Sequence, residues 1–458
     1  MAGWDTLPNL IREEVNQRAS EGCDVTGFAE RVAAAGADEA HLMALYRELM
    51  ALPIRPDFPF SEPSDLAAIR DQRPPTPRPP AASLTAGAWM NRFDGAWLGR
   101  CVGCALGKPL ETGPYFHGGC GRPGWLNVKL WFEGADAWPI RGYTPGRSRA
   151  AETHGLYVRC PNSQAENIRF MESDDDIRYT VLGLAMVEER GLDFDAWDVG
   201  RLWHNRLTYR QVCTAETQAY LNFAQATAHV QPGRPADPGA SLEWVRTHLN
   251  PYREWIGAQI RVDGYAYAAA GRPELAAELA WRDASLSHVK NGIYGAMYVA
   301  ALIAAAFVED DVEKLVQIGL GQIPANCRLA HDVQRAAEMA RRAADQVELV
   351  GQVWDAFSHY HPVHTNNNAA LVTAALIFSR GDFEQAIATA VLGGWDTDCN
   401  GATVGSIMGA LLGVSALPRR WIMPLNDTLY AEVIGFHPIA ISECARRSYE
   451  AFRKLTGG

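Results

Sequence analysis

The stretch 393–413, GGWDTDCNGATVGSIMGALLG, places two aspartates one residue apart just before an apolar segment. Glycine then recurs at every fourth position, at Gly401, Gly405, Gly409 and Gly413. Residues i and i+4 share one face of an α-helix. Each glycine inside a helix costs up to about 1 kcal/mol relative to alanine. The close approach of a second helix is the usual compensation, so this stripe predicts a helix–helix seam.

A second stripe has the same spacing, at Gly95, Gly99, Gly103 and Gly107. Such spacing marks dimer seams in membranes, but both runs are short and flanked by charge, which favours packing within one chain. If the two helices are antiparallel, the carboxyl end of the first lies beside the amino end of the second. We therefore expect Glu111 to lie near Asp396.

The remainder of the chain predicts an all-α protein, a multi-helix orthogonal globule. From about Leu84 onward the sequence is rich in alanine and leucine with a 3.6-residue apolar period, as at Ile177, Val181 and Leu184. Strand signals are scarce. The segment 112–170 is rich in glycine, proline and tryptophan, and we expect a loop insertion there, with or without short strands.

The length of 458 residues exceeds a typical single domain. Residues 1–50 predict an N-terminal helical extension. Residues 51–83 carry nine prolines, which predict a linker or an extended arm because proline disrupts helix interiors. Residues 84–458 would then form the main domain.

Composition excludes several classes of protein. The net charge of −11 argues against nucleic acid or an anionic membrane as partner. No apolar run reaches about 18 residues, so we expect no membrane span, and the most apolar stretch, 292–311, predicts a buried helix. The charged amino terminus does not resemble a signal peptide.

Nine irregularly spaced cysteines favour a reducing, cytoplasmic location over a disulfide framework. Cys101 and Cys104 have CxxC spacing, and we expect them to be small packing residues on a helix.

Acidic residues gather at two predicted helix starts. In ESDDDIRYT, residues 172–180, Ser173 is the expected N-cap and 174–176 fill the first turn. Acidic residues at a helix start gain about 0.3–1 kcal/mol each from the helix dipole, which accounts for one or two of them, as capping accounts for the DTD of 396–398. If both helix starts converge, four or five carboxylates share one pocket, which without cations raises their pKa values. Oxygen ligands of this kind suit Mg²⁺ or Mn²⁺, including paired ions.

Other polar residues are weaker candidates. His359, His361 and His364 crowd together without a second ligand cluster, which favours polar roles in lining a pocket. Asn367 and Asn368 stand at the start of a predicted helix, where capping explains part of the pattern and contact with a ligand is the alternative.

Five motifs together resemble the ADP-ribosylglycohydrolase family. The family's Thr-Asp-Asp-Thr helix start is similar to SDDD at 173–176, and its Gly-Asp-Thr-Asp-Thr is similar to WDTDC at 395–399. Its glycine-rich helix ending in Pro-x-Glu is similar to GCALGKPLE at 103–111, although the family usually has aspartate where Cys104 stands. Ser287-His288 matches a Thr-His pair, and HPVHTNNNAALV at 361–372 is typical of some bacterial members. The motifs keep the family's order and span about 90–415.

The resemblance implies an all-α fold around a binuclear site for two Mg²⁺ or Mn²⁺ ions. The metal ligands that it implies are Ser173, Asp174, Asp175, Asp396, Asp398 and Cys399, with Cys399 in place of a threonine. Since a thiol suits Mg²⁺ poorly, a water or the backbone is the alternative at that position. Glu111 matches a mobile glutamate that gates the site.

The chemistry that the resemblance implies is cleavage of a glycosidic bond at a ribose, in a small-molecule or protein-linked ADP-ribose conjugate. Asp175 or Glu111 would take the proton of a water or stabilise the developing oxocarbenium charge. The substrate-side residues would be His288, His364, Asn367 and Asn368. Two alternatives stay open: hydrolysis of smaller ribosides or nucleosides, and a non-enzymatic structural role, against which the retained aspartates argue.

Overall fold

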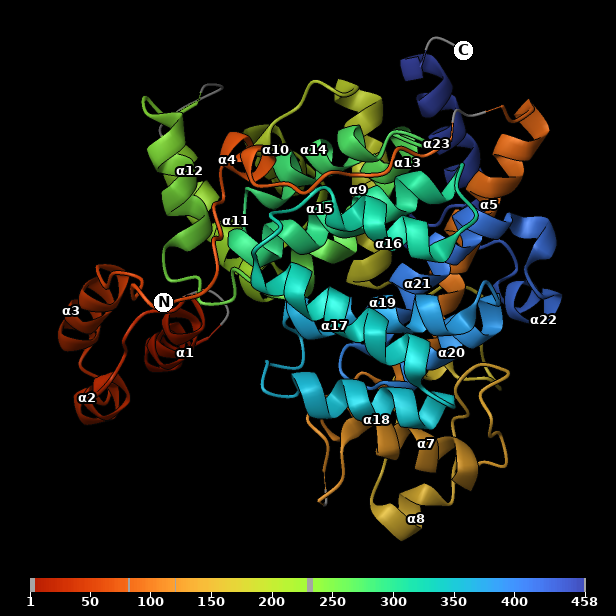
Figure 1. Cartoon of the computed structure of the whole chain (residues 1–458), viewed down its shortest axis with the longest axis horizontal. Helices are drawn as coiled ribbons and strands as arrows, with labels where there is room; N and C mark the ends of the chain where they lie inside the picture. The colour runs from red at the N-terminus through yellow and green to blue at the C-terminus, as the bar shows by residue number, and fades with distance from the viewer. Residues whose placement is uncertain (1–4, 81–82, 120, 229–233, 457–458) are drawn as a thin grey trace.

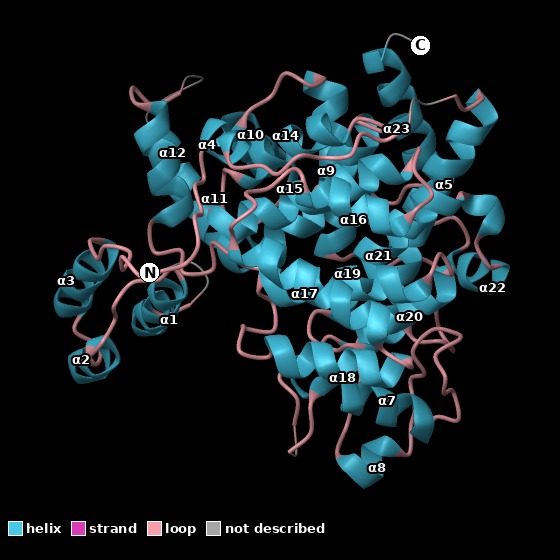
Figure 2. Cartoon of the chain, viewed as in Figure 1, coloured by secondary structure: helices cyan, strands magenta, loops and turns pink. Residues whose placement is uncertain are grey.

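The computed structural model describes residues 5–80, 83–119, 121–228 and 234–456. Over these residues the chain is helical, and it has isolated β-bridges, such as Cys23 with Ile54, but no strand (Figures 1 and 2). The all-α prediction is confirmed. No helix in the described ranges is both long and apolar enough to cross a bilayer.

The first helices are α1 (Leu7–Ser20), α2 (Phe28–Ala35), α3 (Glu39–Met50), α4 (Leu66–Asp71), α5 (Ala86–Gly107), α6 (Gly113–Phe116), α7 (Gly124–Gly134), α8 (Ala150–His154), α9 (Asp175–Arg190), α10 (Ala196–Arg206), α11 (Thr214–Thr227), α12 (Pro238–Thr247) and α13 (Asp263–Ala268). The later helices are α14 (Pro273–Ala284), α15 (Lys290–Ala306), α16 (Val312–Leu320), α17 (Arg328–Arg342), α18 (Gln346–Phe357), α19 (Thr365–Ser379), α20 (Phe383–Leu392), α21 (Thr397–Leu412), α22 (Arg419–Ile422) and α23 (Ile441–Thr456).

The two glycine stripes lie on α5 and α21, which pack against each other in opposite directions. A Cβ atom at Gly103 would overlap the carbonyl oxygen of Gly401, and one at Gly405 would overlap that of Gly99. The two backbones are therefore in contact, as the spacing predicts. At the far end of the seam Thr397 Oγ1 donates a hydrogen bond of 2.9 Å to the carbonyl of Gly107. This contact fixes the end of α5 beside the start of α21.

Arg100, a fully buried residue of α5, ties two further elements to this seam. Its Nε and NH2 groups donate to the carbonyl oxygen of Asp176, in the first turn of α9, at 3.1 and 2.7 Å. Its NH1 group pairs with Asp263, the first residue of α13, at 2.9 Å. The start of α9 is therefore held against the middle of α5.

The most apolar stretch forms α15, whose residues from Asn291 to Ala306 are all buried. A helix that is apolar on every side belongs in a core, so the prediction of a buried helix at 292–311 is confirmed for the part within α15.

The segment 112–170 is mostly loop, as the sequence predicts, but it carries three short helices. It contains α6, α7 and α8, and no strand over 112–119 and 121–170. Pro123 is the N-cap of α7, and Val128, Trp131 and Phe132 are buried on that helix. Proline and glycine here also begin and end short helices, so their abundance masked α7 within the loop.

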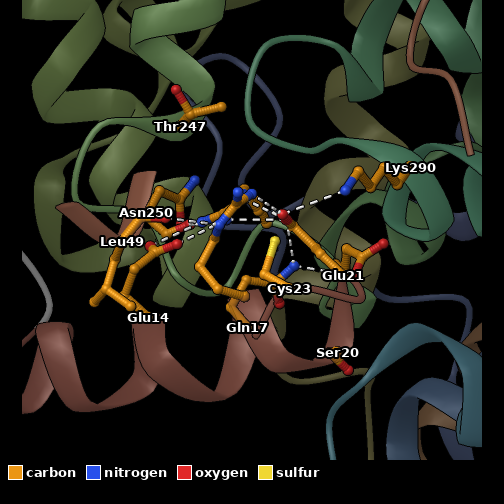
Figure 3. Close-up of polar contacts among 12 residues, drawn as sticks. Glu14, Gln17, Ser20, Glu21, Cys23, Leu49, Thr247, Asn250 and Lys290 are labelled. Carbon is orange, nitrogen blue, oxygen red and sulfur yellow. Dashed lines mark hydrogen bonds and ion pairs between the residues drawn. The ribbon is translucent and has the colours of Figure 1, made fainter. Parts of the chain in front are cut away.

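Helices α1–α3 lie to one side of the molecule (Figure 1) and have a small core of their own, which includes Ile11, Leu42 and Leu45. They meet the rest of the chain through buried charges (Figure 3). Arg253 pairs with Glu14 at 2.7 Å and with Glu21 at 2.9 Å. These contacts dock the extension by ion pairs.

The proline-rich segment, of which 81–82 lie outside the described residues, also contacts the main body. Glu62 pairs with Arg328 of α17 at 2.8 Å. Trp281 of α14 donates from its indole nitrogen to the carbonyl of Ser64 at 2.9 Å. Residues 61–64 are thus attached to two helices.

The seam predicts a contrast between two glycines of one helix. Gly103→Ala should lower the free energy of unfolding by about 3 kcal/mol or more, because its new methyl group would press on backbone that cannot yield. Gly87→Ala, in the first turn of α5 with open space around it, should raise it by up to about 1 kcal/mol. Urea unfolding followed by circular dichroism measures both, and equal midpoints for the two variants would contradict the seam.

Candidate metal centre

The five carboxylates expected at the site come together from three places in the chain. Asp174 and Asp175 lie at the start of α9, Asp396 and Asp398 at the start of α21, and Glu111 directly after the short 3₁₀ helix Lys108–Leu110. Their ligand atoms fall into groups whose members all lie within 4.8 Å of one another: Glu111, Asp396 and Asp398; Asp174, Asp175 and Asp176; and Cys104, Asp174 and Asp398. The expected approach of Glu111 to Asp396 is confirmed.

The helix starts are capped differently from the sequence prediction. Asp174, not Ser173, is the N-cap of α9, and its carboxylate accepts a hydrogen bond of 2.9 Å from the backbone N–H of Asp176. The Ser173 hydroxyl instead accepts a hydrogen bond of 2.9 Å from the guanidinium of Arg178. The predicted N-cap was wrong because the guanidinium of Arg178, about one turn further along, binds the Ser173 hydroxyl.

The clustering shifts the pKa of most of these carboxyls upward. Burial and the charge of Asp174 raise the pKa of Asp398 to about 7. Burial and the charge of Asp398 raise the pKa of Asp396 well above its usual range. Asp174 is the exception, because the buried ammonium of Lys108 outweighs the effect of burial and lowers its pKa to about 2. Without further positive charge the site cannot hold all its carboxylates ionised.

The residues present fit a divalent cation. Asp398 is only 2% exposed, and its Oδ1 atom has no hydrogen-bond partner among the described residues. A buried oxygen of this kind costs free energy unless something binds it. The neighbouring donors are carboxylate oxygens, the ligands that Mg²⁺ and Mn²⁺ prefer.

The two cysteines of the motifs lie differently, relative to the carboxylates, from what the motifs suggest. Cys399 is buried but belongs to none of the close ligand groups in the described chain. Cys104 packs on α5 as expected, and its sulfur also lies within 4.8 Å of the ligand atoms of Asp174 and Asp398. Burial raises the pKa of both thiols well above the usual range. The signal for Cys104 was present in the sequence, since the family carries aspartate at that position.

Lys108 is the other site residue that the sequence analysis missed. Its ammonium forms an ion pair with Asp174, and the two side chains are 10% and 2% exposed. The GCALGKPLE motif contains this lysine, but nothing in its spacing shows that the side chain turns back over the end of α5 into the carboxylates.

A cavity of about 390 Å³ lies over the cluster. Glu111, Asp175 and Asp396 line one part of it. Trp255 and His361 line another part, with their rings stacked at a centroid distance of 4.1 Å. The carboxylates are thus reached through an opening with aromatic walls.

His288 and His364, two of the four residues expected on the substrate side, do not line this cavity. His288 is fully buried, and its Nε2 atom lies 3.9 Å from Glu216, which does line it. His364 is the N-cap of α19 and borders a second cavity of about 510 Å³ beside α1. Trp255 and His361 border both cavities.

The two asparagines expected on the substrate side, Asn367 and Asn368, are also fully buried. Both donate hydrogen bonds to the carbonyl of Pro362, at 3.2 and 2.7 Å. Pro362 itself lines the 390 Å³ cavity. The asparagine side chains therefore hold the wall of the cavity from behind.

The raised pKa of Asp398 predicts a pH-dependent effect of its removal in metal-free protein. A carboxyl with a raised folded-state pKa stabilises the fold below its unfolded pKa of about 3.8, and this stabilisation is lost as pH rises through about 7. Asp398→Asn should therefore melt above wild type at pH 5, by about 2 kcal/mol, and further above it at pH 8, by at most about 4 kcal/mol.

Calorimetry in a chelator at the two pH values measures this difference. Asp355→Asn, which changes an exposed aspartate of α18, should shift neither melting temperature. A difference between Asp398→Asn and wild type that does not change from pH 5 to pH 8 would contradict the prediction.

Comparison with known proteins identifies the family of this chain. A family model described as ADP-ribosylglycohydrolase matches residues 85–454. A search of curated proteins finds no match. A solved structure described as an ADP-ribosylglycohydrolase-related protein complex is 22% identical, with a TM-score of 0.49, and the match covers 80% of this chain and 99% of that one. By the extent of the family match, the chain belongs to the ADP-ribosylglycohydrolase family.

Proposed function

We propose that the protein is a metal-dependent hydrolase that cleaves the glycosidic bond of ADP-ribose conjugates. The observation that carries this proposal is the convergence of Glu111 with the paired aspartates of two helix starts at one cavity. Family membership supports a glycosidase of this kind.

The metal would be Mg²⁺ or Mn²⁺, held by Asp174, Asp175, Asp396 and Asp398. Ser173 and Cys399 would be its weaker ligands. A divalent ion there would neutralise the carboxylates and orient the hydroxyls of a ribose. Asp398 supplies the clearest reason for a cation, because one of its buried oxygens is otherwise unpartnered.

The chain's own residues would handle the proton and the sugar. Asp175 and Glu111 both line the cavity, so either can accept a proton from water or stabilise positive charge at the anomeric carbon. Asn367 and Asn368 would act through Pro362, and His288 through Glu216, by fixing the cavity wall. His364 would shape the loop that carries His361.

Smaller ribosides or nucleosides are the second candidate substrates. No lysine or arginine is among the described residues that line the 390 Å³ cavity. Enzymes commonly pair phosphate groups with such side chains, so the lining favours a substrate whose recognised part is uncharged. The stacked rings of Trp255 and His361 suit a flat, aromatic leaving group.

A substrate panel tests the proposal and ranks the two classes. Release of free sugar from ADP-ribosyl-arginine, O-acetyl-ADP-ribose and a set of nucleosides is measured with Mn²⁺ and with a chelator. We expect cleavage only with the metal. Failure to cleave any of these ribosides would refute the proposed activity, whereas cleavage of nucleosides alone would select the second class.

Asp175→Asn and Asp396→Asn should each lower turnover of the best substrate by about 100-fold or more at saturating Mn²⁺, because each removes a carboxylate from the centre. The fold should persist, since loss of one negative charge relieves repulsion. Asp355→Asn is the matched control and should turn over like wild type. Near wild-type turnover in either site variant would show that its carboxylate is not part of the machinery.

A further inference from the structure

Lys108 is a buried positive charge inside a cluster that is expected to bind cations. It follows Gly107, whose backbone is packed against Thr397, and it opens the 3₁₀ helix Lys108–Leu110. The residue is 8% exposed and its ammonium forms an ion pair with Asp174. One of the implied metal ligands is therefore already bound to a cation supplied by the chain.

Ser173, the ligand expected next to Asp174, is engaged in the same way. Its hydroxyl accepts a hydrogen bond of 2.9 Å from Arg178, whose other terminal nitrogen donates to the carbonyl of Gln211 at 3.0 Å. Arg178 is held on two sides, so it is a fixed partner of the serine. Both implied ligands that precede α9 are occupied by basic side chains.

The third donor on this side of the cluster is the sulfur of Cys104, grouped with Asp174 and Asp398. A thiol is a poor ligand for Mg²⁺. A second group shares Asp398 with the first and adds Glu111 and Asp396. None of these three carboxylates forms a salt bridge with a lysine or arginine among the described residues. One of these two groups therefore contains a carboxylate already paired with a lysine, and the other contains carboxylates only.

We propose that the Lys108 ammonium takes the place of one of the two cations, so that the centre binds a single divalent ion, on the side of Glu111, Asp396 and Asp398. This inference rests on the proposed metal binding. It changes the number of ions from the two implied by the family resemblance to one, and it changes the ligands, because Asp174 would hold Lys108 and not the metal. The lysine charge and a second ion would compete for Asp174, and the lysine is covalently fixed there.

The test counts ions in the full-length protein. Wild type and Lys108→Met, which keeps the length of the side chain without its charge, are equilibrated with millimolar Mn²⁺, and bound metal is measured by mass spectrometry after dialysis. We expect one Mn²⁺ per wild-type chain and two per Lys108→Met chain. Electron paramagnetic resonance should show an isolated Mn²⁺ in wild type and a spin-coupled pair in the variant.

Two further variants serve as controls. Lys314→Met removes an exposed lysine and should bind one ion, as wild type does. Lys108→Arg keeps the positive charge and should also bind one, which keeps the test decisive if circular dichroism shows that Lys108→Met does not fold. Two ions in wild type or in Lys108→Arg, or one in folded Lys108→Met, would overturn the inference while leaving metal dependence intact. No ion in wild type would refute the proposed metal binding itself.

Discussion

Mutual repulsion among carboxylates is the constraint around which the centre of this molecule is arranged. Asp174, Asp396 and Asp398 approach one another inside the protein, where charges interact more strongly than in water. Two helix starts point their partial positive charge at the cluster, and Lys108 adds a full one. The carboxylates stay together because the backbones that carry them are also fixed elsewhere, as in the backbone contact between α5 and α21.

Buried arginines tie this centre, and more distant segments, into the fold. Arg100 joins α5 to the first turns of α9 and α13. Arg253 joins the N-terminal helices to the main body, and Arg328 joins Glu62 of the proline-rich segment to Glu254. A buried guanidinium is tolerated only when carboxylates or carbonyls satisfy it, so each arginine specifies the position of several segments that are distant in sequence.

Sequence reasoning reached those features that depend on spacing along one helix. The glycine stripes defined the seam, and the antiparallel arrangement placed Glu111 beside Asp396. Sequence reasoning failed where the outcome depends on the direction of a single side chain. Asp174, and not Ser173, caps α9, because Arg178 binds the Ser173 hydroxyl. Lys108 was missed because only the three-dimensional path at the end of α5 turns its side chain toward the acids. Cys104 was missed although the aspartate that the family carries at its position pointed to it. In 112–170, composition suggested a loop, whereas buried Trp131 and Phe132 stabilise a helix.

The seam between α5 and α21 has a consequence for how this sequence can diverge. A side chain added at Gly99, Gly103 or Gly405 meets a carbonyl oxygen of the partner helix and not another side chain. A clash between two side chains can be cured by shrinking the second one, but a main-chain atom is present whatever residue carries it. Suppressor mutations at the facing position are therefore ruled out, and each glycine of the seam is constrained on its own.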